Sequence, residues 1–338
     1  MTNLLMLGLL ALACQASDPP LGDLSNNERF VADVVKQWDE YRQFSMRLQG
    51  SVEWTVFKYE QKQRNFWGNT HFEFKQDESQ IRILAENSGP AFEQSANPIL
   101  GIGMLVNRDG VYSLRRAKSA GSWLLVGQSS DRSVESINSV SRAGNPYDFA
   151  ARNICSCLKI DVVWLSDVFT DPGFSITEFK PIEHNDRKLL RVSFVCDPKK
   201  IITVVRKGWV LLDPSNHYIL REYYCDCNWG NELGSEKAVF EYADERNGFP
   251  ILKRAFTQCF GPTSVPSAEY EEQFHLVEQP SVPDEDFALS TFGISMKGTA
   301  RGWLRYYLLA AGFALVLVGI VCRLISRRWQ RQQGTGGT

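Results

Sequence analysis

Alternation of apolar and polar residues over most of the chain is the feature that constrains its fold most. Between Leu48 and Val56, apolar side chains alternate with polar ones, which is typical of a strand with one buried face. Comparable runs recur at residues 70–75, 80–86, 111–116, 123–128, 175–181, 189–196, 203–212, 218–228, 237–243, 252–260 and 270–279. The pattern predicts a mainly β (α+β) fold.

Turn-forming sequences such as Asp109-Gly110 and Asp213-Pro214 separate many of these runs. Strands that follow one another through short turns pair as antiparallel hairpins. We therefore expect two meanders within one large curved antiparallel sheet, an unclosed half-barrel. The fragment Gly101-Ile102-Gly103 is interpreted as a bend.

Two or three helices are expected on the concave side of this sheet. Asn26 and Asn27 can cap a helix that runs to about Ser45, with its apolar residues at helical spacing. Asn145-Pro146 can begin a second helix that ends near Cys157, and residues 160–169 a third. The second and third helices form an insert between the two meanders.

The last forty residues predict a membrane anchor. An apolar run from Tyr306 to Cys322, extended by Leu324 and Ile325, reaches about 20 residues, which is enough to cross a bilayer as one helix. We assign a juxtamembrane linker to residues 297–305, the membrane helix to 306–325 and a short basic cytoplasmic tail to 326–338. The arginines of the tail agree with the positive-inside rule.

The first sixteen residues have the layout of a secretory signal peptide, with an apolar stretch that ends in small residues. Cleavage would leave residues 17–296 as one extracytoplasmic domain. The sequence Ala11-Leu12-Ala13-Cys14 also resembles a bacterial lipoprotein processing box, so lipidation of Cys14 stays open.

The charge balance excludes nucleic acid as the partner. The chain has 37 Lys and Arg and 39 Asp and Glu, and four of the arginines belong to the tail, so the part before it carries a net charge of about −6. Such a domain would repel a phosphate backbone.

Six of the eight cysteines belong to the expected extracytoplasmic domain. In an oxidising compartment an even number predicts up to three disulfides, whose pairing the sequence does not choose. A metal or redox site built from the two Cys-x-Cys pairs is the alternative, although the spacing is unlike that of zinc ligands. The disulfide candidates are Cys155, Cys157, Cys196, Cys225, Cys227 and Cys259.

Sequence patterns of catalysis are not recognised, and we expect no cofactor and no metal. The four histidines form no metal-binding or nucleophile motif. His217 is expected to share a strand face with Arg221, Tyr223, Cys225 and Cys227, either as a polar cluster or as ordinary surface pairing. The acidic residues near 269–272 and 284–286 lack the ligand spacing of a calcium loop and are interpreted as a solvated edge.

The order of the elements resembles the bacterial periplasmic lipoprotein-carrier (LolA/LolB-like) fold over about residues 25–290. Trp209–Pro214, followed by Tyr218–Glu222, looks like the strand, Asp-Pro turn and strand of that family. Asn247–Leu252 looks like its next hairpin, and Phe287–Gly293 is similar to a group of anchored bacterial envelope proteins of unassigned function.

The resemblance implies a non-enzymatic domain of the bacterial cell envelope, with a hydrophobic cavity for a lipid, lipoprotein or peptide in the concave face of its sheet. Its own anchor would make it a single-pass membrane protein with the domain outside the cytoplasm. Two alternatives remain: a disulfide-stapled protein–protein interaction scaffold without a cavity, and a redox or hydrolytic enzyme. The expected cavity walls are the aromatic residues Trp54, Phe72, Phe74, Trp123 and Trp209.

Overall fold

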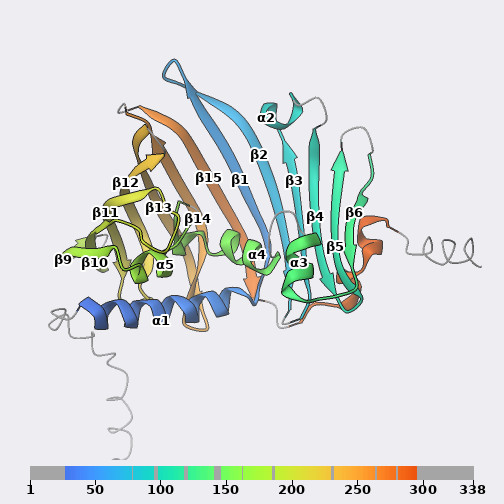
Figure 1. Cartoon of the computed structure of the whole chain (residues 1–338), viewed down its shortest axis with the longest axis horizontal. Helices are drawn as coiled ribbons and strands as arrows, with labels where there is room; N and C mark the ends of the chain where they lie inside the picture. Colours follow the sequence, from blue (N-terminus) through green and yellow to red (C-terminus); the bar gives the residue numbers. More distant parts are fainter. Residues whose placement is uncertain are drawn as a thin grey trace, which may run out of the picture. The chain divides into compact units, whose positions relative to one another are not determined.

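A single antiparallel sheet organises the protein (Figure 1). In this computed structural model the described residues are 27–294, except 78, 95–97, 118–120, 141–145, 162, 185–186, 230–231, 263–264 and 279–280 and the side chains of residues 134 and 244. The chain divides into two units, the first ending at Phe287 and the second beginning at Ala288. The first unit contains the whole sheet and ends with the short helix η2 (Asp284–Phe287), and the second begins with η3 (Leu289–Phe292).

Within the described part of the chain the sheet has 13 strands in the order β6-β5-β4-β3-β2-β1-β15-β14-β13-β12-β11-β10-β9. β6 and β9 are its two ends and do not pair with each other, so the sheet is unclosed. The strands are β1 (Leu48–Glu60), β2 (Gln63–Gln76), β3 (Ile81–Ser88), β4 (Ile99–Asn107), β5 (Gly110–Ala117), β6 (Leu124–Ser129), β9 (Phe174–His184), β10 (Arg187–Cys196), β11 (Val205–Asp213), β12 (Ile219–Trp229), β13 (Glu232–Arg246), β14 (Phe249–Phe260) and β15 (Pro266–Glu278).

Pairing of β1 with β15 joins two meanders into this sheet. Strands β1–β6 form the first meander and β9–β15 the second, and the register runs from Leu48 opposite Glu278 to Lys58 opposite Ala268. Because the first strand pairs with the last, β6 and β9 lie at opposite edges. At about 4.8 Å per strand, the connection between them must cross about 55–60 Å of sheet.

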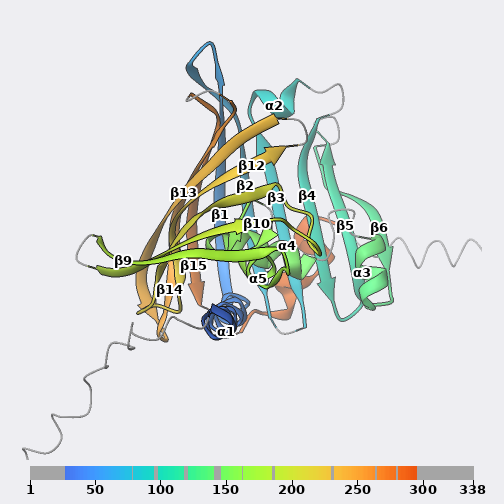
Figure 2. The same ribbon diagram turned by 60° about the vertical axis from the view of Figure 1, so that its left-hand side comes forward.

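The connection between β6 and β9 crosses the concave side as a helical insert. It contains α3 (Val134–Val140), α4 (Pro146–Ile154), η1 (Ser156–Leu158), β7 (Lys159–Ile160), β8 (Val163–Trp164) and α5 (Leu165–Thr170). α3 packs on β5 and β6, α4 on β1, β3 and β4, η1 on β12 and β14, and α5 on β9. Figure 2 shows the second meander curving in front of α4 and α5.

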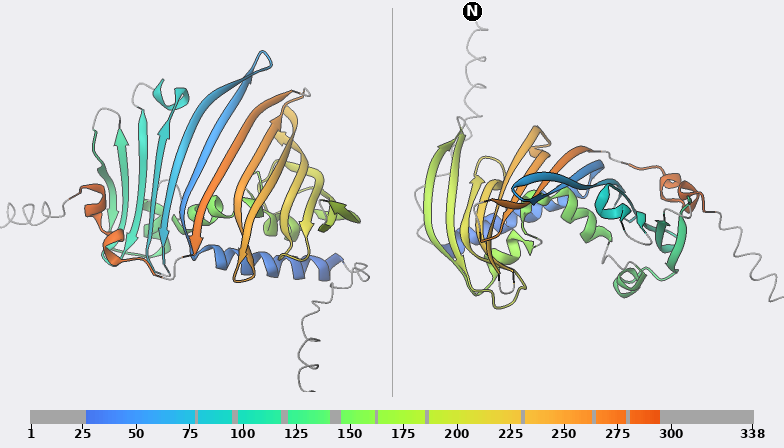
Figure 3. Two further views of the ribbon diagram at one scale, coloured as in Figure 1. Left: turned by 180° about the vertical axis from the view of Figure 1, so that it is seen from behind. Right: turned by 90° about the horizontal axis from the view of Figure 1, so that it is seen from above.

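Helix α1 (Asn27–Ser45) runs along the ends of the strands, below them in Figure 1, and crosses the curve of the sheet in the view from above (Figure 3). It buries Phe30, Val34, Trp38, Tyr41 and Phe44, which recur every three or four residues and form one stripe. Trp38 Nε1 donates to the carbonyl of Tyr218 at 2.8 Å, and Tyr41 Oη to that of Pro250 at 2.8 Å. These bonds fix α1 across the β11–β12 and β13–β14 turns.

The core lies between the inner face of the sheet, α1 and the insert. Phe74 on β2, Phe194 on β10 and Trp38 are among the largest side chains that are fully buried there. A smaller cluster lies on the outer face, where Leu105, Tyr112 and Leu114 are buried and Asn107 Nδ2 donates to the carbonyl of Phe287 at 2.8 Å.

The expected mainly β fold with a large unclosed antiparallel sheet and few helices is confirmed. The expected strands are all present, and the first helix has the expected end at Ser45. The bend assigned at Gly101–Gly103 is wrong: these residues lie inside β4, where Gly101 leaves room for the Trp123 ring. Helices α2 (Pro90–Glu93) and α3 were not expected, and α5 begins at Leu165 instead of residue 160.

The expected signal peptide (1–16), linker (297–305), membrane helix (306–325) and tail (326–338) lie outside the described residues, as do Cys14 and Cys322. Among the helices that the structure describes, none is long and apolar enough to cross a membrane.

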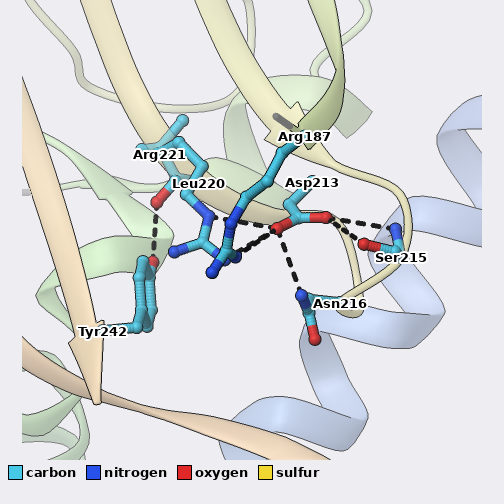
Figure 4. Close-up of polar contacts among 7 residues, drawn as sticks. All are labelled: Arg187, Asp213, Ser215, Asn216, Leu220, Arg221 and Tyr242. Atoms are coloured by element: carbon cyan, nitrogen blue, oxygen red, sulfur yellow. Dashed lines mark hydrogen bonds and ion pairs between the residues drawn. The ribbon is translucent and has the colours of Figure 1, made fainter. Parts of the chain in front are cut away.

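The Asp213-Pro214 turn between β11 and β12 is built around a buried carboxylate (Figure 4). Asp213 accepts hydrogen bonds from the Ser215 hydroxyl at 2.6 Å, from Asn216 Nδ2 at 3.2 Å and from Arg221 Nη2 at 2.7 Å. Arg221 also lies over the Tyr242 ring, 4.5 Å from its centroid. Burial by itself would raise the pKa of Asp213, but these hydrogen bonds and the Arg221 charge lower it overall.

Replacing Asp213 should therefore destabilise the domain strongly. We expect Asp213→Asn to lower the free energy of unfolding by about 3 kcal/mol, because it leaves the mostly buried Arg221 without its counter-charge. The matched control is Asp226→Asn on β12, whose partner Lys207 is exposed, with an expected loss below about 0.5 kcal/mol. Urea denaturation monitored by circular dichroism measures both.

The same carboxylate makes stability depend on pH in a defined direction. Because its folded-state pKa lies below the usual 3.8, its contribution is complete above about pH 4 and is lost as the pH falls through the lower folded-state value. The stability difference between the wild type and Asp213→Asn should therefore shrink as acid is added. A difference that stays constant down to pH 2 would contradict this role.

Candidate functional site

A cavity of about 600 Å³ lies between the inner face of the sheet and the helical insert. The sheet side is contributed by β1, β2 and β12–β15, and the insert side by α4, η1 and β7. The lining residues are Val52, Trp54, Phe72, Asn153, Ser156, Lys159, Asp161, Tyr223, Trp229, Glu236, Phe240, Ala255, Thr257, Cys259, Ser267, Ala268, Tyr270 and Glu272. Its volume is within the usual range for small-molecule sites, about 300–1,000 Å³.

Aromatic rings form one part of the cavity wall. Trp54 on β1 stacks on Tyr270 of β15, with ring centroids 5.8 Å apart and planes at 12°. Phe72 and Phe240 come from β2 and β13 at positions that alternate inward. This part of the wall can hold an apolar ligand segment.

Glu236 anchors the polar part of the wall. Its carboxylate accepts a hydrogen bond from the Tyr223 hydroxyl, one from the Asp161 amide at 3.3 Å and one from the Cys259 thiol at 3.7 Å. Burial raises the pKa of Glu236, and the Asp161 charge raises it further. These contacts connect β12, β13 and β14 to the insert and leave Glu236 well satisfied.

Glu272 is different, because its Oε2 atom is buried and has no hydrogen-bond partner among the described residues. Burial raises the pKa of Glu272, whereas the positive charge of Lys159 and the Ser156 hydroxyl lower it. Lys159 is half-buried, and its desolvation in the cavity wall lowers the pKa of its ammonium group. Ser156 Oγ also lacks a partner in the described part of the chain. Ionisable groups so placed in a cavity are typical of functional sites.

Of the expected wall residues, Trp54 and Phe72 line the cavity. Phe74 lies next to Phe72 with ring centroids 5.9 Å apart, but it is fully buried in the core. Trp123 packs against Gly101 beside Arg116, and Trp209 lies under Arg191, whose guanidinium is 4.6 Å from the ring centroid. Neither tryptophan lines this cavity. In β11 it is Val210 and Leu212 that enter the core.

The charged residues of the site were missed by the sequence analysis. Glu236 and Glu272 occupy inward positions of their strands, in phase with Phe240 and Phe274. The sequence therefore did contain a signal for these two site residues: each is an acidic residue at a position where the alternation predicts an inward, apolar side chain. Lys159 and Asp161 belong to the insert, whose position over the sheet follows from strand order and could not be read from periodicity.

His217 does not belong to the expected polar cluster, and that expectation is wrong. It lies before β12 with φ of 54°, stacks on Phe249 with ring centroids 4.2 Å apart, and its Nε2 is 3.1 Å from the Gly248 carbonyl. A left-handed residue interrupts the alternation, so its side chain is not in phase with those of β12. Tyr223, Cys225 and Cys227 do share the inner face.

The six cysteines are all free thiols in the structure. Five are buried and Cys259 is partly exposed, and the sulfurs of Cys225 and Cys227 are 3.5 Å apart on β12. Burial raises the pKa of Cys155 and Cys157, that of Cys157 to about 11. The expected disulfides thus stay a prediction. No group of three metal-ligating side chains occurs among the residues described, which gives the alternative of a Cys-x-Cys metal site no support.

The acidic run of β15 is divided by the strand alternation. Glu269 and Glu271 both bind Arg64 of β2, whereas Glu272 faces the cavity. Asp286 pairs with Lys75 at 2.9 Å. Glu269 and Glu271 therefore share one arginine on the outer face. The interpretation of this run as a solvated edge is wrong, because β15 is an interior strand, Glu269 is buried and Glu272 lines the cavity.

A second hollow of about 1,140 Å³ lies at the C-terminal end of α1. Its lining includes Phe44, Arg47, Tyr147, Phe249 and Glu278. Glu278 pairs with Arg47 at 3.5 Å, and Glu40 and Asp77 also line this hollow. The first cavity differs in holding a buried carboxylate oxygen for which the described residues provide no partner.

Comparison with known proteins finds no matching family model and no matching curated protein. Three solved structures are similar at low identity. A Vibrio parahaemolyticus domain described as outer membrane lipoprotein-sorting has 11% identity and a TM-score of 0.39, covering 78% of this chain and 99% of that one. A LolA superfamily protein from Nitrosomonas europaea has 11% identity and a TM-score of 0.36, and the match covers 76% of this chain and 97% of that one. A DUF1329 family protein from Desulfovibrio piger has 9% identity and a TM-score of 0.40, and the match covers 78% of this chain and 98% of that one.

The burial of the thiols predicts a labelling pattern. In folded protein that has first been reduced, we expect iodoacetamide to modify Cys259 slowly and the other five cysteines only after denaturation, because burial blocks access and disfavours the thiolate. Peptide mass spectrometry locates the label. Rapid modification of Cys155 or Cys225 in the folded state would contradict the packing. Labelling of unreduced, denatured protein counts the disulfides, since each removes two reactive thiols.

Proposed function

We propose that the domain is a non-enzymatic binding module that holds an apolar or amphipathic ligand, a lipid, a lipoprotein acyl chain or a peptide segment, in the cavity beneath the helical insert. The observation that carries the proposal is the cavity itself, in which Glu272, with its unsatisfied oxygen, lies next to the stacked rings of Trp54 and Tyr270. Sites for small ligands combine apolar walls with placed polar groups. This cavity has both, with a larger polar share that suits an amphipathic ligand.

The chemistry of the cavity supports binding over catalysis. Burial and the Glu236 charge raise the pKa of Cys259, which disfavours the thiolate that a nucleophilic cysteine requires. Glu236 accepts hydrogen bonds from Tyr223, Asp161 and Cys259, so its carboxyl group belongs to a structural network. These contacts are suited to fixing the shape of the cavity.

The proposal includes the location inferred from the sequence. A signal peptide and a membrane helix at 306–325 would tether the domain to the bacterial cell envelope, outside the cytoplasm. A tethered domain does not exchange between membranes, so a role as a receptor or sensor of its ligand suits it better than shuttling. Protease protection of tagged protein in intact spheroplasts tests this orientation.

A second candidate function is protein–protein interaction through the edge strand β6. Leu124, Leu125 and Val126 are 50%, 37% and 53% exposed, respectively, although they are apolar residues on the free edge of the sheet. Such an edge can accept a further strand. This function would correspond to the scaffold alternative and does not require a ligand in the cavity.

Filling the cavity tests the binding function. Ala268→Trp places a large ring at a lining position of β15, and we expect it to weaken binding of a fluorescent fatty acid by about tenfold or more, because ring and ligand compete for one space. The matched control is Gln273→Trp on the same strand, where the side chain is exposed, with affinity expected to stay within about twofold. Fluorescence titration measures both.

The proposed binding function fails if the wild-type domain takes up neither the fatty acid nor another apolar probe. It also fails if Ala268→Trp, shown by circular dichroism to be folded, binds as tightly as the wild type.

A further inference from the structure

We propose that the ligand of this cavity carries a primary ammonium group, which binds at Glu272 while its apolar part lies along Trp54 and Tyr270. This inference rests on the proposed binding function and specifies the class of ligand.

The fold places Glu272 in the wall of the cavity, but the described residues provide no hydrogen-bond donor for one of its oxygens. Glu272 lies directly opposite Trp54 in the β1–β15 register and opposite Ala255 in the β14–β15 register, and all three residues line the cavity. Its Oε2 is buried and has no hydrogen-bond partner in the described part of the chain. A buried carboxylate oxygen without a donor costs free energy, and a donor on the ligand would remove that cost.

The protein's own cation in the cavity does not meet this need. Lys159 belongs to the short β7–β8 hairpin, where it lies opposite Trp164, and its charge acts on Glu272. Even so, its ammonium group donates no hydrogen bond to Oε2. The Ser156 hydroxyl lies near the same carboxyl group and lowers its pKa, but it forms no hydrogen bond to Oε2. Oε2 is therefore an acceptor without a donor among the described residues, and an ammonium group supplies several N–H donors.

The charge of the wall favours a cation over an anion. Three acidic side chains, Glu272, Glu236 and Asp161, line the cavity with one basic side chain, Lys159. A carboxylate or phosphate group on a ligand would add to the excess of negative charge in a poorly solvated space. An ammonium group would reduce this excess, and the rings of Trp54 and Tyr270 beside it remain available to the apolar part of the ligand.

Three probes of one chain length test the inference: dodecylamine, dodecanol and dodecanoate, each used below its micellar concentration. Their affinities come from displacement of N-phenyl-1-naphthylamine from the wild-type domain. We expect dodecylamine to bind about tenfold tighter than dodecanol, as for a charge-assisted hydrogen bond in a buried site, and dodecanoate to bind most weakly.

Glu272→Gln removes the charge and keeps the shape. It should reduce the preference for dodecylamine over dodecanol to less than about threefold and leave dodecanol binding unchanged. The matched control is Glu271→Gln, the neighbouring residue on the outer face, which binds Arg64. It should keep the full preference for the amine.

Lys159→Met should change the affinity for dodecylamine in the direction opposite to that of Glu272→Gln. Removing the competing cation should strengthen dodecylamine binding, because Glu272 then depends on the ligand for its counter-charge. A general disturbance of the cavity would weaken all three probes instead. This variant also keeps the test decisive if Glu272→Gln does not fold.

The outcomes separate this inference from the proposed function. If none of the three probes displaces the dye, and the dye itself does not bind, the binding function is wrong. If dodecanol binds as tightly as dodecylamine, the cavity is a binding site but the ammonium preference is wrong. A preference for the amine that survives Glu272→Gln, or that falls in Lys159→Met, also overturns the assignment to Glu272.

Discussion

Pairing between the first strand and the last determines the rest of the structure. Because β1 pairs with β15, the ends of the two meanders become opposite edges of one open sheet, and residues 130–173 have to cross its concave face. That crossing places η1 and β7 over the inner ends of Glu272, Tyr223 and Glu236. The cavity and its charged groups are therefore consequences of strand order.

Buried carboxylates in this domain differ in how fully their oxygens are hydrogen-bonded. Asp213, at the end of β11, receives several donors and stays ionised despite its burial. Glu236 is bonded on both oxygens to groups from two strands and the insert. Glu272 has an oxygen that the described part of the chain leaves unbonded. Two of these carboxylates are explained by stability, and for the third we propose a ligand.

Local patterns predicted most of the elements. Alternation revealed the strands, including β12 and its inward Cys225 and Cys227, and the 3–4 spacing from Phe30 to Phe44 revealed α1. Alternation failed at β4, where Gly101 and Gly103 resemble a turn but lie within the strand, and where Gly101 leaves room for the Trp123 ring. It also misplaced His217, since a left-handed residue shifts the phase of the strand after it.

The candidate site was less accessible to sequence reasoning, for a physical reason. Aromatic residues are frequent on the inner and outer faces alike, so Trp54 and Trp209 could not be distinguished until the register of their strands was known. Lys159 reaches the cavity only because the insert crosses the sheet, which depends on a pairing between residues more than 200 positions apart. Long-range pairing of this kind leaves no local pattern.

Native mass spectrometry of the domain, purified without detergent and then extracted with solvent, tests most directly whether the cavity is a ligand site. We expect a mass in excess of the polypeptide, released by denaturation, that belongs to an amphipathic molecule and is absent from Ala268→Trp. A wild-type domain that shows the bare polypeptide mass and stays unchanged after incubation with apolar amines, alcohols and acids would contradict a binding function for this cavity.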